Sequence, residues 1–350
     1  MNLHQRSPEL LPPAAADHAT VVGLTKILEE QKSDITNRSA RSIYPKKKSV
    51  LTNEAAPGKT LKDTLKKSPL LVKLVRQFKR TILNREIENC LIDLRDLFLS
   101  YQTSALQRSY PNPLNKFGVK CFSQTDEDGI TLEILKRTNS LDNGTFAEFG
   151  VGDGTENNTL ILKALGWKGF WVGGEELAFK TEQRNQAFAY IKAWITLDNI
   201  VELAEQGKKA LNANTVDVIS LDLDGNDFYF VDKLLSKGFT PKLFIVEYNA
   251  KFPPPIKWKI NYDPTHTWNF DDYFGASLAS FVELFEQHGF RLLCCNSHTG
   301  SNAFFIRQDF ISAFGDVPQD IKDIYVPPRY YLYKTYGHRP SLKTISKLFI

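Results

Sequence analysis

The sequence has little that would support a disulfide framework or a cysteine-based metal centre. Only four of its 350 residues are cysteines (Cys90, Cys121, Cys294 and Cys295), and they form neither a CxxC motif nor a Cys/His metal-binding spacing. Neighbouring Cys294 and Cys295 would point to opposite faces of a strand, so a bond between them is not expected. This cysteine usage is typical of a protein in a reducing compartment.

Long apolar runs are also missing. No stretch approaches the roughly 20 apolar residues that a membrane-spanning helix needs. Residues 1–11 lack the apolar core of a signal peptide. These absences predict a cytoplasmic protein without a transmembrane segment.

Charge is distributed unevenly along the chain. Residues 1–80 contain 16 Lys or Arg against 7 Asp or Glu, whereas the remainder contains 28 against 33. Residues 1–68 are rich in Pro, Ala, Ser, Thr and Lys, so they cannot bury enough apolar surface to offset the entropy of ordering. We predict a disordered basic arm that could contact anionic surfaces. Because the rest of the chain is net acidic, nucleic acid is not an expected partner.

Helical periodicity starts after the arm and predicts a helical extension over residues 69–108. Its apolar positions fall into two groups, Leu70, Leu71, Leu74, Val75, Phe78 and Ile82, then Ile87, Cys90, Leu91, Leu94, Leu97 and Phe98. Basic residues lie mostly between those of the first group. That first helix either touches acidic lipid or polyanions, or docks on the body with a solvated basic face, which is the commoner use of such a pattern.

From Tyr110 onward, short apolar runs alternate with helical patterns, which predicts a mostly parallel sheet covered by helices on both faces. The expected strands are 145–149, 169–173, 189–195, 217–221 and 242–248. The expected helices are 122–137, 157–165, 181–185, 200–210, 228–237 and 277–288. Two last strands, 290–295 and 303–307, predict a closing antiparallel hairpin. We expect this α/β domain to span 109–317, with an aromatic and basic tail over 318–350.

A glycine-rich turn follows the first strand, where Gly150, Gly152 and Gly154 let the chain turn sharply and approach a ligand closely. The spacing differs from the G-x-G-x-x-G of dinucleotide sites. Glu148 and Asp153 add two carboxylates, which would repel a pyrophosphate and attract a cationic ligand such as S-adenosylmethionine. The alternative is a purely structural turn.

Several motifs together resemble the FkbM-like and related class I S-adenosylmethionine-dependent methyltransferases. They are FAEFGVGDGTENN over 146–158, GWKG over 166–169, Ser123-Gln124, Asp128-Gly129, SLDLDGND over 220–227, VEYN over 246–249, NYD over 261–263, His266, Trp268, YFGAS over 273–277 and NAFF over 302–305. The resemblance covers residues 115–310. It implies a Rossmann-like class I methyltransferase fold and methylation of oxygen on a small or glycan-like acceptor, such as a sugar hydroxyl.

The cofactor site that the resemblance implies consists of Gln124, Glu148, Gly150, Gly152, Asp153, Asn158, Glu175, Asp198 and Asn199. One departure concerns the second strand, which in this family usually ends in an acid that holds the ribose hydroxyls. Here the matching position is Gly173, and Glu175 is the candidate to replace that acid. The departure motivates a second interpretation, in which the chain is a catalytically weak or inactive methyltransferase-like binding protein.

Acidic side chains follow the fourth and fifth expected strands, where an open α/β sheet binds its ligands. Asp222, Asp224 and Asp227 end one strand region and Glu247 ends the next. Oxygen ligands suit Mg²⁺, so Asp222, Asp227 and Glu247 form a candidate metal site that could activate an acceptor hydroxyl. Alternatively, one of these acids is a general base, or Asp227 caps the helix after it.

His266 lies in a loop after the fifth expected strand. Its pKa range suits a general base near neutral pH, and packing within the loop is the alternative. The candidate catalytic residues are therefore Asp222, Asp224 and His266.

Overall fold

The computed structural model describes residues 83–94, 97–98, 101, 104–105, 107–179 and 187–329. All of them belong to one unit of the chain, Thr81–Ile350. The predicted arm, the helix expected at 181–185 and most of the expected tail lie outside the described residues. Within the described ranges, no helix combines the length and apolar character needed to cross a membrane.

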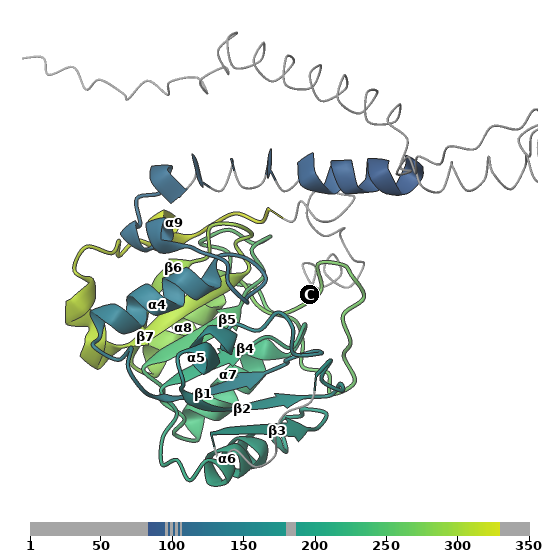
Figure 1. Cartoon of the computed structure of the whole chain (residues 1–350). Helices are drawn as coiled ribbons and strands as arrows, with labels where there is room; N and C mark the ends of the chain where they lie inside the picture. Colours follow the sequence, from purple (N-terminus) through teal and green to yellow (C-terminus); the bar gives the residue numbers. More distant parts are fainter. Residues whose placement is uncertain are drawn as a thin grey trace, which may run out of the picture. The chain divides into compact units, whose positions relative to one another are not determined.

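Seven strands form one sheet, in the order β3-β2-β1-β4-β5-β7-β6 (Figure 1). The bounds are β1 Thr145–Phe149, β2 Lys168–Gly173, β3 Phe188–Lys192, β4 Val218–Leu221, β5 Leu243–Glu247, β6 Phe290–Cys295 and β7 Asn302–Arg307. Strands β1 to β5 pair in parallel, and β7 runs antiparallel to both β5 and β6. The predicted Rossmann-like sheet with a closing antiparallel hairpin is confirmed.

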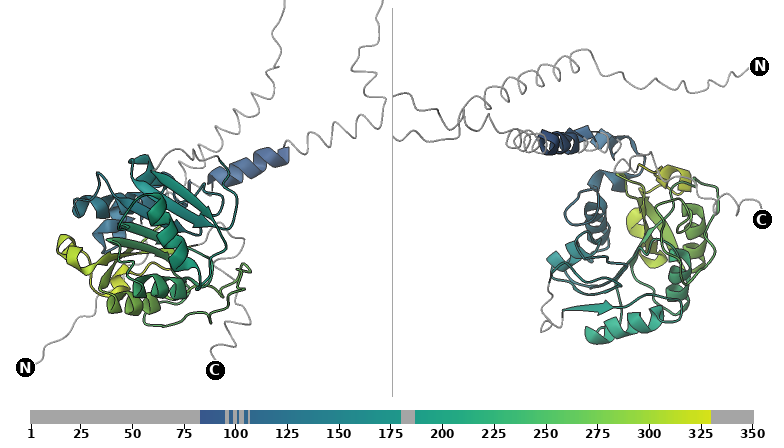
Figure 2. Two further views of the ribbon diagram at one scale, coloured as in Figure 1. Left: turned by 90° about the horizontal axis from the view of Figure 1, so that it is seen from below. Right: turned by 90° about the vertical axis from the view of Figure 1, so that its right-hand side faces the viewer.

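Helices cover both faces of the sheet, as Figures 1 and 2 show. On one face, α6 (Ile200–Ala210), α7 (Asp227–Ser236) and α8 (Leu278–Gln287) pack on side chains such as Phe149 and Val246. On the other, α4 (Glu127–Arg137) and α5 (Leu160–Ala164) pack on side chains such as Phe146 and Ile245. The short elements are the 3-10 helices η1 (Pro113–Phe117) and η2 (Gln308–Phe314) and helix α9 (Ile321–Ile324).

Neighbouring strand residues mostly contribute to opposite cores, as the period of two requires, but an irregularity in β6 places Leu293 and Cys294 in the same core. Cys294 belongs to the α4 side and Cys295 to the α6 side, and both are buried free thiols. The predicted opposite orientation of these two cysteines is confirmed.

Helix α4 begins later than the sequence pattern predicts. The expected start was residue 122, and the observed start is Glu127. The Asp128 carboxylate accepts the main-chain N–H groups of Cys121, Phe122 and Ser123 at 2.7, 2.6 and 2.9 Å. These bonds hold residues 121–123 in a turn. The Asp128 carboxylate accepts their backbone N–H groups in place of the carbonyl oxygens that would accept them in a helix.

Two acids at the start of α4 bind the turn between β6 and β7. Asp126 accepts the N–H groups of Ser297 and His298, each at 3.1 Å. Glu127 accepts the side-chain amides of Asn296 at 3.0 Å and Asn302 at 3.1 Å. Asp126 and Glu127 are almost fully buried. These bonds tie α4 to the hairpin that ends the sheet.

Candidate functional site

The glycine-rich turn after β1 lies directly against the loop after β4. Gly150 has φ of 90°, and a β-carbon built on it would lie 1.6 Å from the carbonyl oxygen of Asp222. Only glycine therefore allows these two loops to touch. Strand order reverses between β1 and β4, and ligands of open α/β sheets bind outside the strand ends at such a switch point.

Glu148 lies beneath this turn and is buried. One carboxylate oxygen accepts the N–H of Asn158 at 2.9 Å, and the other accepts the N–H of Thr159 at 3.1 Å and its hydroxyl. Burial raises the pKa of Glu148, and the hydrogen bonds from Thr159 and Asn158 oppose that rise. These contacts connect β1 to the start of α5, so local donors already engage both carboxylate oxygens.

Asn158 takes part in the same network. Its side-chain amide donates to the Ser220 hydroxyl of β4 at 3.1 Å. Glu148 and Asn158, two predicted cofactor ligands, thus belong to a buried hydrogen-bond network that joins β1, β4 and the start of α5. Their contact with a cofactor stays a prediction.

Gly152, Asp153 and Thr155 are the exposed residues of the turn. A β-carbon built on Gly152 would meet no atom within 4 Å, and Asp153 is exposed. One Asp153 carboxylate oxygen accepts the N–H and the hydroxyl of Thr155 at 3.0 and 2.6 Å. The Asp153 carbonyl accepts the N–H of Ala178 at 2.8 Å, which fixes the turn to the segment after β2.

The end of β2 has no carboxylate, as the sequence indicated. A β-carbon built on Gly173 would lie 2.9 Å from Cγ2 of Val151 and 3.4 Å from the Tyr190 hydroxyl. An acidic side chain there would require Val151 to shift. Tyr190 donates to the carbonyl oxygens of Gly173 and Glu175, and the Glu175 side chain is exposed two residues farther on.

The remaining predicted cofactor residues lie at element ends. Asn199 precedes α6, where its side chain accepts the N–H of Thr196 at 2.8 Å and donates to the Trp194 carbonyl at 2.9 Å. Asp198 beside it is exposed, as is Gln124 ahead of α4.

Trp194 is a residue that the sequence reasoning missed. Its side chain is 60% exposed, and a β-carbon built on Gly174 would lie 3.6 Å from its ring. The expected strand 189–195 contained this tryptophan, but the observed strand β3 ends at Lys192, which places Trp194 just beyond it.

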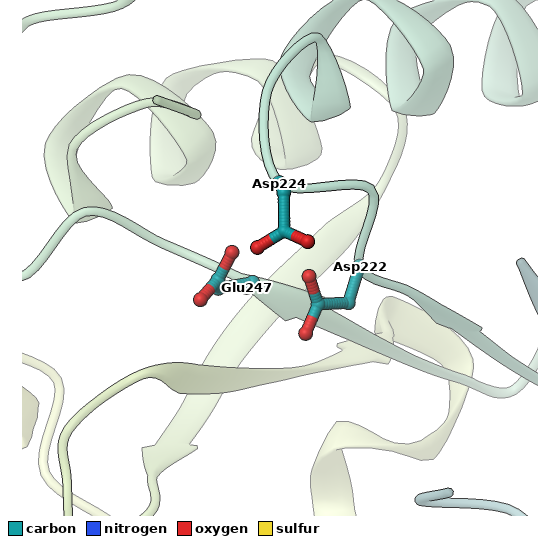
Figure 3. Close-up of side chains that lie close together, drawn as sticks. All are labelled: Asp222, Asp224 and Glu247. Atoms are coloured by element: carbon teal, nitrogen blue, oxygen red, sulfur yellow. The ribbon is translucent and has the colours of Figure 1, made fainter. Parts of the chain in front are cut away.

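Three carboxylates gather at the ends of β4 and β5 (Figure 3). Asp222, Asp224 and Glu247 each offer an oxygen, and these oxygens lie within 4.8 Å of one another. Asp222 directly follows β4, Glu247 ends β5, and Asp224 has a positive φ of 52°. We call these three residues the acid cluster.

The acid cluster differs from the predicted metal set in one residue. Asp227 was expected to join Asp222 and Glu247, but its carboxylate accepts the N–H groups of Leu223 at 2.7 Å and Gly225 at 2.8 Å. Asp227 thus stabilises the turn that carries Asp224, and it is the first residue of α7, whose N-cap is Asn226. The predicted metal set of Asp222, Asp227 and Glu247 stays a prediction, and in the acid cluster Asp224 is the third carboxylate.

Burial and mutual repulsion raise the pKa values of the acid cluster. The pKa of Asp222 and that of Glu247 lie well above their ordinary values, first because of burial. Repulsion by Asp224 and Asp227 raises the pKa of Asp222 further, and repulsion by Asp222 and Asp224 does the same for Glu247. The two carboxyl groups are hydrogen-bonded to each other and share one proton. Burial also raises the pKa of Asp224, and it raises the pKa of Asp227 to about 6.

The arrangement fits a hard cation as well as a shared proton. Oε2 of Glu247 is buried and has no hydrogen-bond partner among the described residues. Three carboxylates at such short separation repel one another unless a positive charge lies among them. Asn249 does not join them, because its side-chain amide donates to the carbonyl oxygens of Asp272 and Phe274 at 2.9 and 3.1 Å.

His266 lies against the turn that carries the acid cluster. A β-carbon built on Gly225 would lie 2.3 Å from Cδ2 of His266. Asn226 fixes the His266 loop by donating to the Asp263 carbonyl at 2.8 Å and accepting its N–H at 3.2 Å. The structure therefore brings the three predicted catalytic residues, Asp222, Asp224 and His266, to one turn.

Comparison with known proteins gives weak likenesses only. No protein-family profile matches the sequence, and no curated protein matches it. The solved structure of CalO1, a methyltransferase in calicheamicin biosynthesis, is 17% identical with a TM-score of 0.31, over 50% of this chain and 53% of that one. Human N-acetylserotonin methyltransferase is 11% identical with a TM-score of 0.30, over 50% of each chain.

A putative hemolysin from Streptococcus thermophilus is 12% identical with a TM-score of 0.35, over 59% of this chain and 74% of that one. Likenesses of this strength support no conclusion about what the present chain does.

Proposed function

We propose that the chain is an S-adenosylmethionine-dependent methyltransferase that methylates a hydroxyl oxygen of a small or glycan-like acceptor. The observation that carries the proposal is the contact between the Gly150 turn and Asp222. It joins a ligand-accessible glycine turn to the acid cluster at the switch point of the sheet. A cofactor at the turn and an acceptor at the cluster would be neighbours.

The cofactor side of the proposal rests on Gly152 and Asp153. The open space at Gly152 permits close approach to the backbone, and the exposed Asp153 carboxylate favours a ligand with positive charge. S-adenosylmethionine carries a sulfonium and an ammonium group, and when bound it supplies an electrophilic methyl group. Glu175, Asp198 and Gln124 are exposed polar residues available to the rest of that ligand.

The acceptor side rests on the acid cluster and His266. A hydroxyl oxygen must lose a proton as it attacks, and a carboxylate whose pKa is raised by burial is a stronger base than an ordinary one. Asp222 is the proposed base, with Glu247 sharing its proton and His266 beside the same turn. If a divalent cation is needed, Asp222, Asp224 and Glu247 would hold it, and it would lower the pKa of the acceptor hydroxyl.

The test combines binding with turnover. Titration calorimetry with S-adenosylmethionine should show saturable binding, and incubation with labelled cofactor and a panel of sugars and phenols should transfer label to one class. Asp222→Asn should retain cofactor binding and lose turnover. Asp232→Asn, which changes an acid on α7 whose side chain is 50% exposed, is the matched control and should retain both.

A second candidate is a methyltransferase-like binding protein without catalysis. The absent carboxylate at Gly173, where a side chain would require Val151 to shift, favours it. Absence of cofactor binding at millimolar concentrations would exclude the enzyme and leave this candidate.

A further inference from the structure

A tryptophan just after β3 is exposed at the edge of the sheet where the parallel strands end. The Trp194 side chain is 60% exposed, whereas Trp167, Trp171 and Trp258 are at most 5% exposed. Tryptophan is on average one of the more deeply buried residues. Trp194 is the second residue after β3, at the edge where open α/β sheets bind their ligands. Its exposed ring is therefore placed to contact a ligand.

Short contacts connect Trp194 to the glycine turn. A β-carbon built on Gly174 would lie 3.6 Å from Cε3 of Trp194, and one built on Gly173 would lie 2.9 Å from Cγ2 of Val151 in the turn. Gly152 and Gly174 are both exposed. Because glycine has no side chain, the backbone at the ends of β1 and β2 is open to a ligand that also reaches the Trp194 ring.

The backbone that carries Trp194 is fixed on both sides. The N–H of Ala193 donates to the Gly173 carbonyl at 2.9 Å, which ties the residue before Trp194 to β2. The Asn199 side chain donates to the Trp194 carbonyl at 2.9 Å and accepts the N–H of Thr196 at 2.8 Å. An exposed ring on a backbone held in this way loses little further freedom when a ligand binds.

The acid cluster determines which part of the proposed cofactor faces Trp194. The acid cluster lies at the ends of β4 and β5, on one side of β1, and β2 and β3 lie on the other side (Figure 1). Transfer requires the methyl group to face an acceptor at the acid cluster, and Asp153 favours the positive charges of the cofactor. The adenosine part then extends over the ends of β2 and β3, towards Trp194.

Adenine has the chemistry that an exposed indole ring binds. It is a flat, uncharged ring system, and nucleobases stack on aromatic side chains without needing a hydrogen-bonding partner. Such a contact supplies affinity beside the end of β2, where Gly173 offers no carboxylate. We propose that Trp194 binds the adenine ring of S-adenosylmethionine by stacking, and that Asn199 is a positioning residue for Trp194. The inference rests on the proposed function, because it takes this cofactor as the ligand.

Calorimetry with two ligands tests the contact: S-adenosylmethionine, and methylthioadenosine, which keeps the adenosine and lacks the amino-acid part. Trp194→Leu should weaken the binding of both by about tenfold or more, since leucine is apolar but has no aromatic face, and Trp194→Phe should stay within about threefold of the wild type. Phe270→Ala is the matched control, because it removes a 69% exposed aromatic side chain from the loop after β5. It should bind both ligands like the wild type.

The outcomes separate this contact from the proposed function. If the wild type binds S-adenosylmethionine and Trp194→Leu binds it equally well, the stacking contact is wrong and the proposed function stands. The contact is also wrong if Trp194→Phe loses as much affinity as Trp194→Leu, or if the loss accompanies a lower stability in urea. A wild type that binds neither ligand at millimolar concentrations would overturn the proposed function and the contact together.

Tryptophan fluorescence gives a second measurement at Trp194 itself. An exposed indole emits at longer wavelength than the buried ones, and S-adenosylmethionine should quench this part of the emission. Trp194→Phe should lose the quenching and still bind the ligand in calorimetry. Quenching of equal size in Trp194→Phe would place the cofactor beside another tryptophan and overturn the contact.

Asn199→Ala separates a positioning role from direct contact with the cofactor. If Asn199 acts through Trp194, Asn199→Ala should weaken binding in the wild type and have little further effect in Trp194→Leu. An equal loss in both backgrounds would make Asn199 a direct ligand. No loss in either would show that the Trp194 backbone is held without it, and each of these two results would overturn the positioning role.

Discussion

Gly150 and Asp222 are in contact through their backbones, closely enough that a β-carbon on Gly150 would lie 1.6 Å from the Asp222 carbonyl oxygen. One methyl group at position 150 would therefore separate the glycine turn from the acid cluster. No side-chain rearrangement can relieve this clash, because the obstructing atom belongs to the backbone.

Gly150→Ala should impair both folding and cofactor binding. Gly152→Ala is its control for folding, because it adds the same methyl group into open space and should lower the free energy of unfolding only by the strain of a positive φ, about 1–2 kcal/mol. Urea unfolding measures the stability of both variants, and calorimetry with S-adenosylmethionine measures cofactor binding, which both substitutions should weaken. Equal losses of stability in the two variants would contradict the claim that the contact with Asp222 matters for folding.

Glu148→Gln should lower stability more than it lowers cofactor affinity. A glutamine amide would direct one of its donors at a backbone N–H that Glu148 now accepts, so the expected loss in the free energy of unfolding is about 2 kcal/mol. Asp153→Asn, at an exposed position of the same turn, should show the reverse pattern. If Glu148→Gln instead weakens cofactor binding without loss of stability, Glu148 is a direct ligand.

Asp222→Asn should reduce methyl transfer by about 100-fold or more, since it removes the proposed base. It should also make the protein less sensitive to alkaline pH. The pKa values of Asp222 and Glu247 are raised in the folded state, so the folded chain binds more protons than the unfolded chain. Wild-type stability therefore falls as pH rises from about 4 through the raised pKa values.

Chemical denaturation at several pH values would show this. Part of the wild-type decrease belongs to Asp227, whose pKa rises to about 6, and should remain in Asp222→Asn. A slope unchanged by Asp222→Asn would show that the acid cluster is not under electrostatic strain.

Mg²⁺ should raise the melting temperature of the wild type and have little effect on Asp224→Asn. The shift should grow with pH, because a cation competes with the proton held by Asp222 and Glu247. Asp232→Asn serves again as the control. If Mg²⁺ does not change the melting temperature of the wild type at pH 8, the acid cluster does not bind the cation, and proton transfer remains its proposed role.

The sequence pattern predicted the regular elements well where one periodicity dominates. The bounds of β1 and α6 agree residue for residue with the expected 145–149 and 200–210. The start of α4 was wrong by five residues, because it depends on three backbone donors that the Asp128 carboxylate takes from the segment before it. Hydrophobic periodicity does not show whether a side chain or the helix backbone will accept these N–H groups.

The site was predictable as far as the topology determines it. Asp222 and Glu247 meet because parallel neighbours β4 and β5 end at one edge of the sheet. The exchange of Asp227 for Asp224 was not predictable, since it depends on the positive φ of Asp224 and on which N–H groups the turn offers. The partners of Glu148, the N–H groups of Asn158 and Thr159, were likewise not predictable, because they depend on how the chain folds back after the glycine turn.

The bonds between the start of α4 and the β6–β7 turn have a consequence for synthesis. Ser297 is made 171 residues after Asp126, a delay of roughly 10–30 s at ordinary ribosomal rates. When β5 has been made, at Glu247, the nascent chain still lacks the donors of the β6–β7 turn that Asp126 and Glu127 bind. We therefore expect the first five strands to stay incompletely packed until this late hairpin is made and completes the sheet.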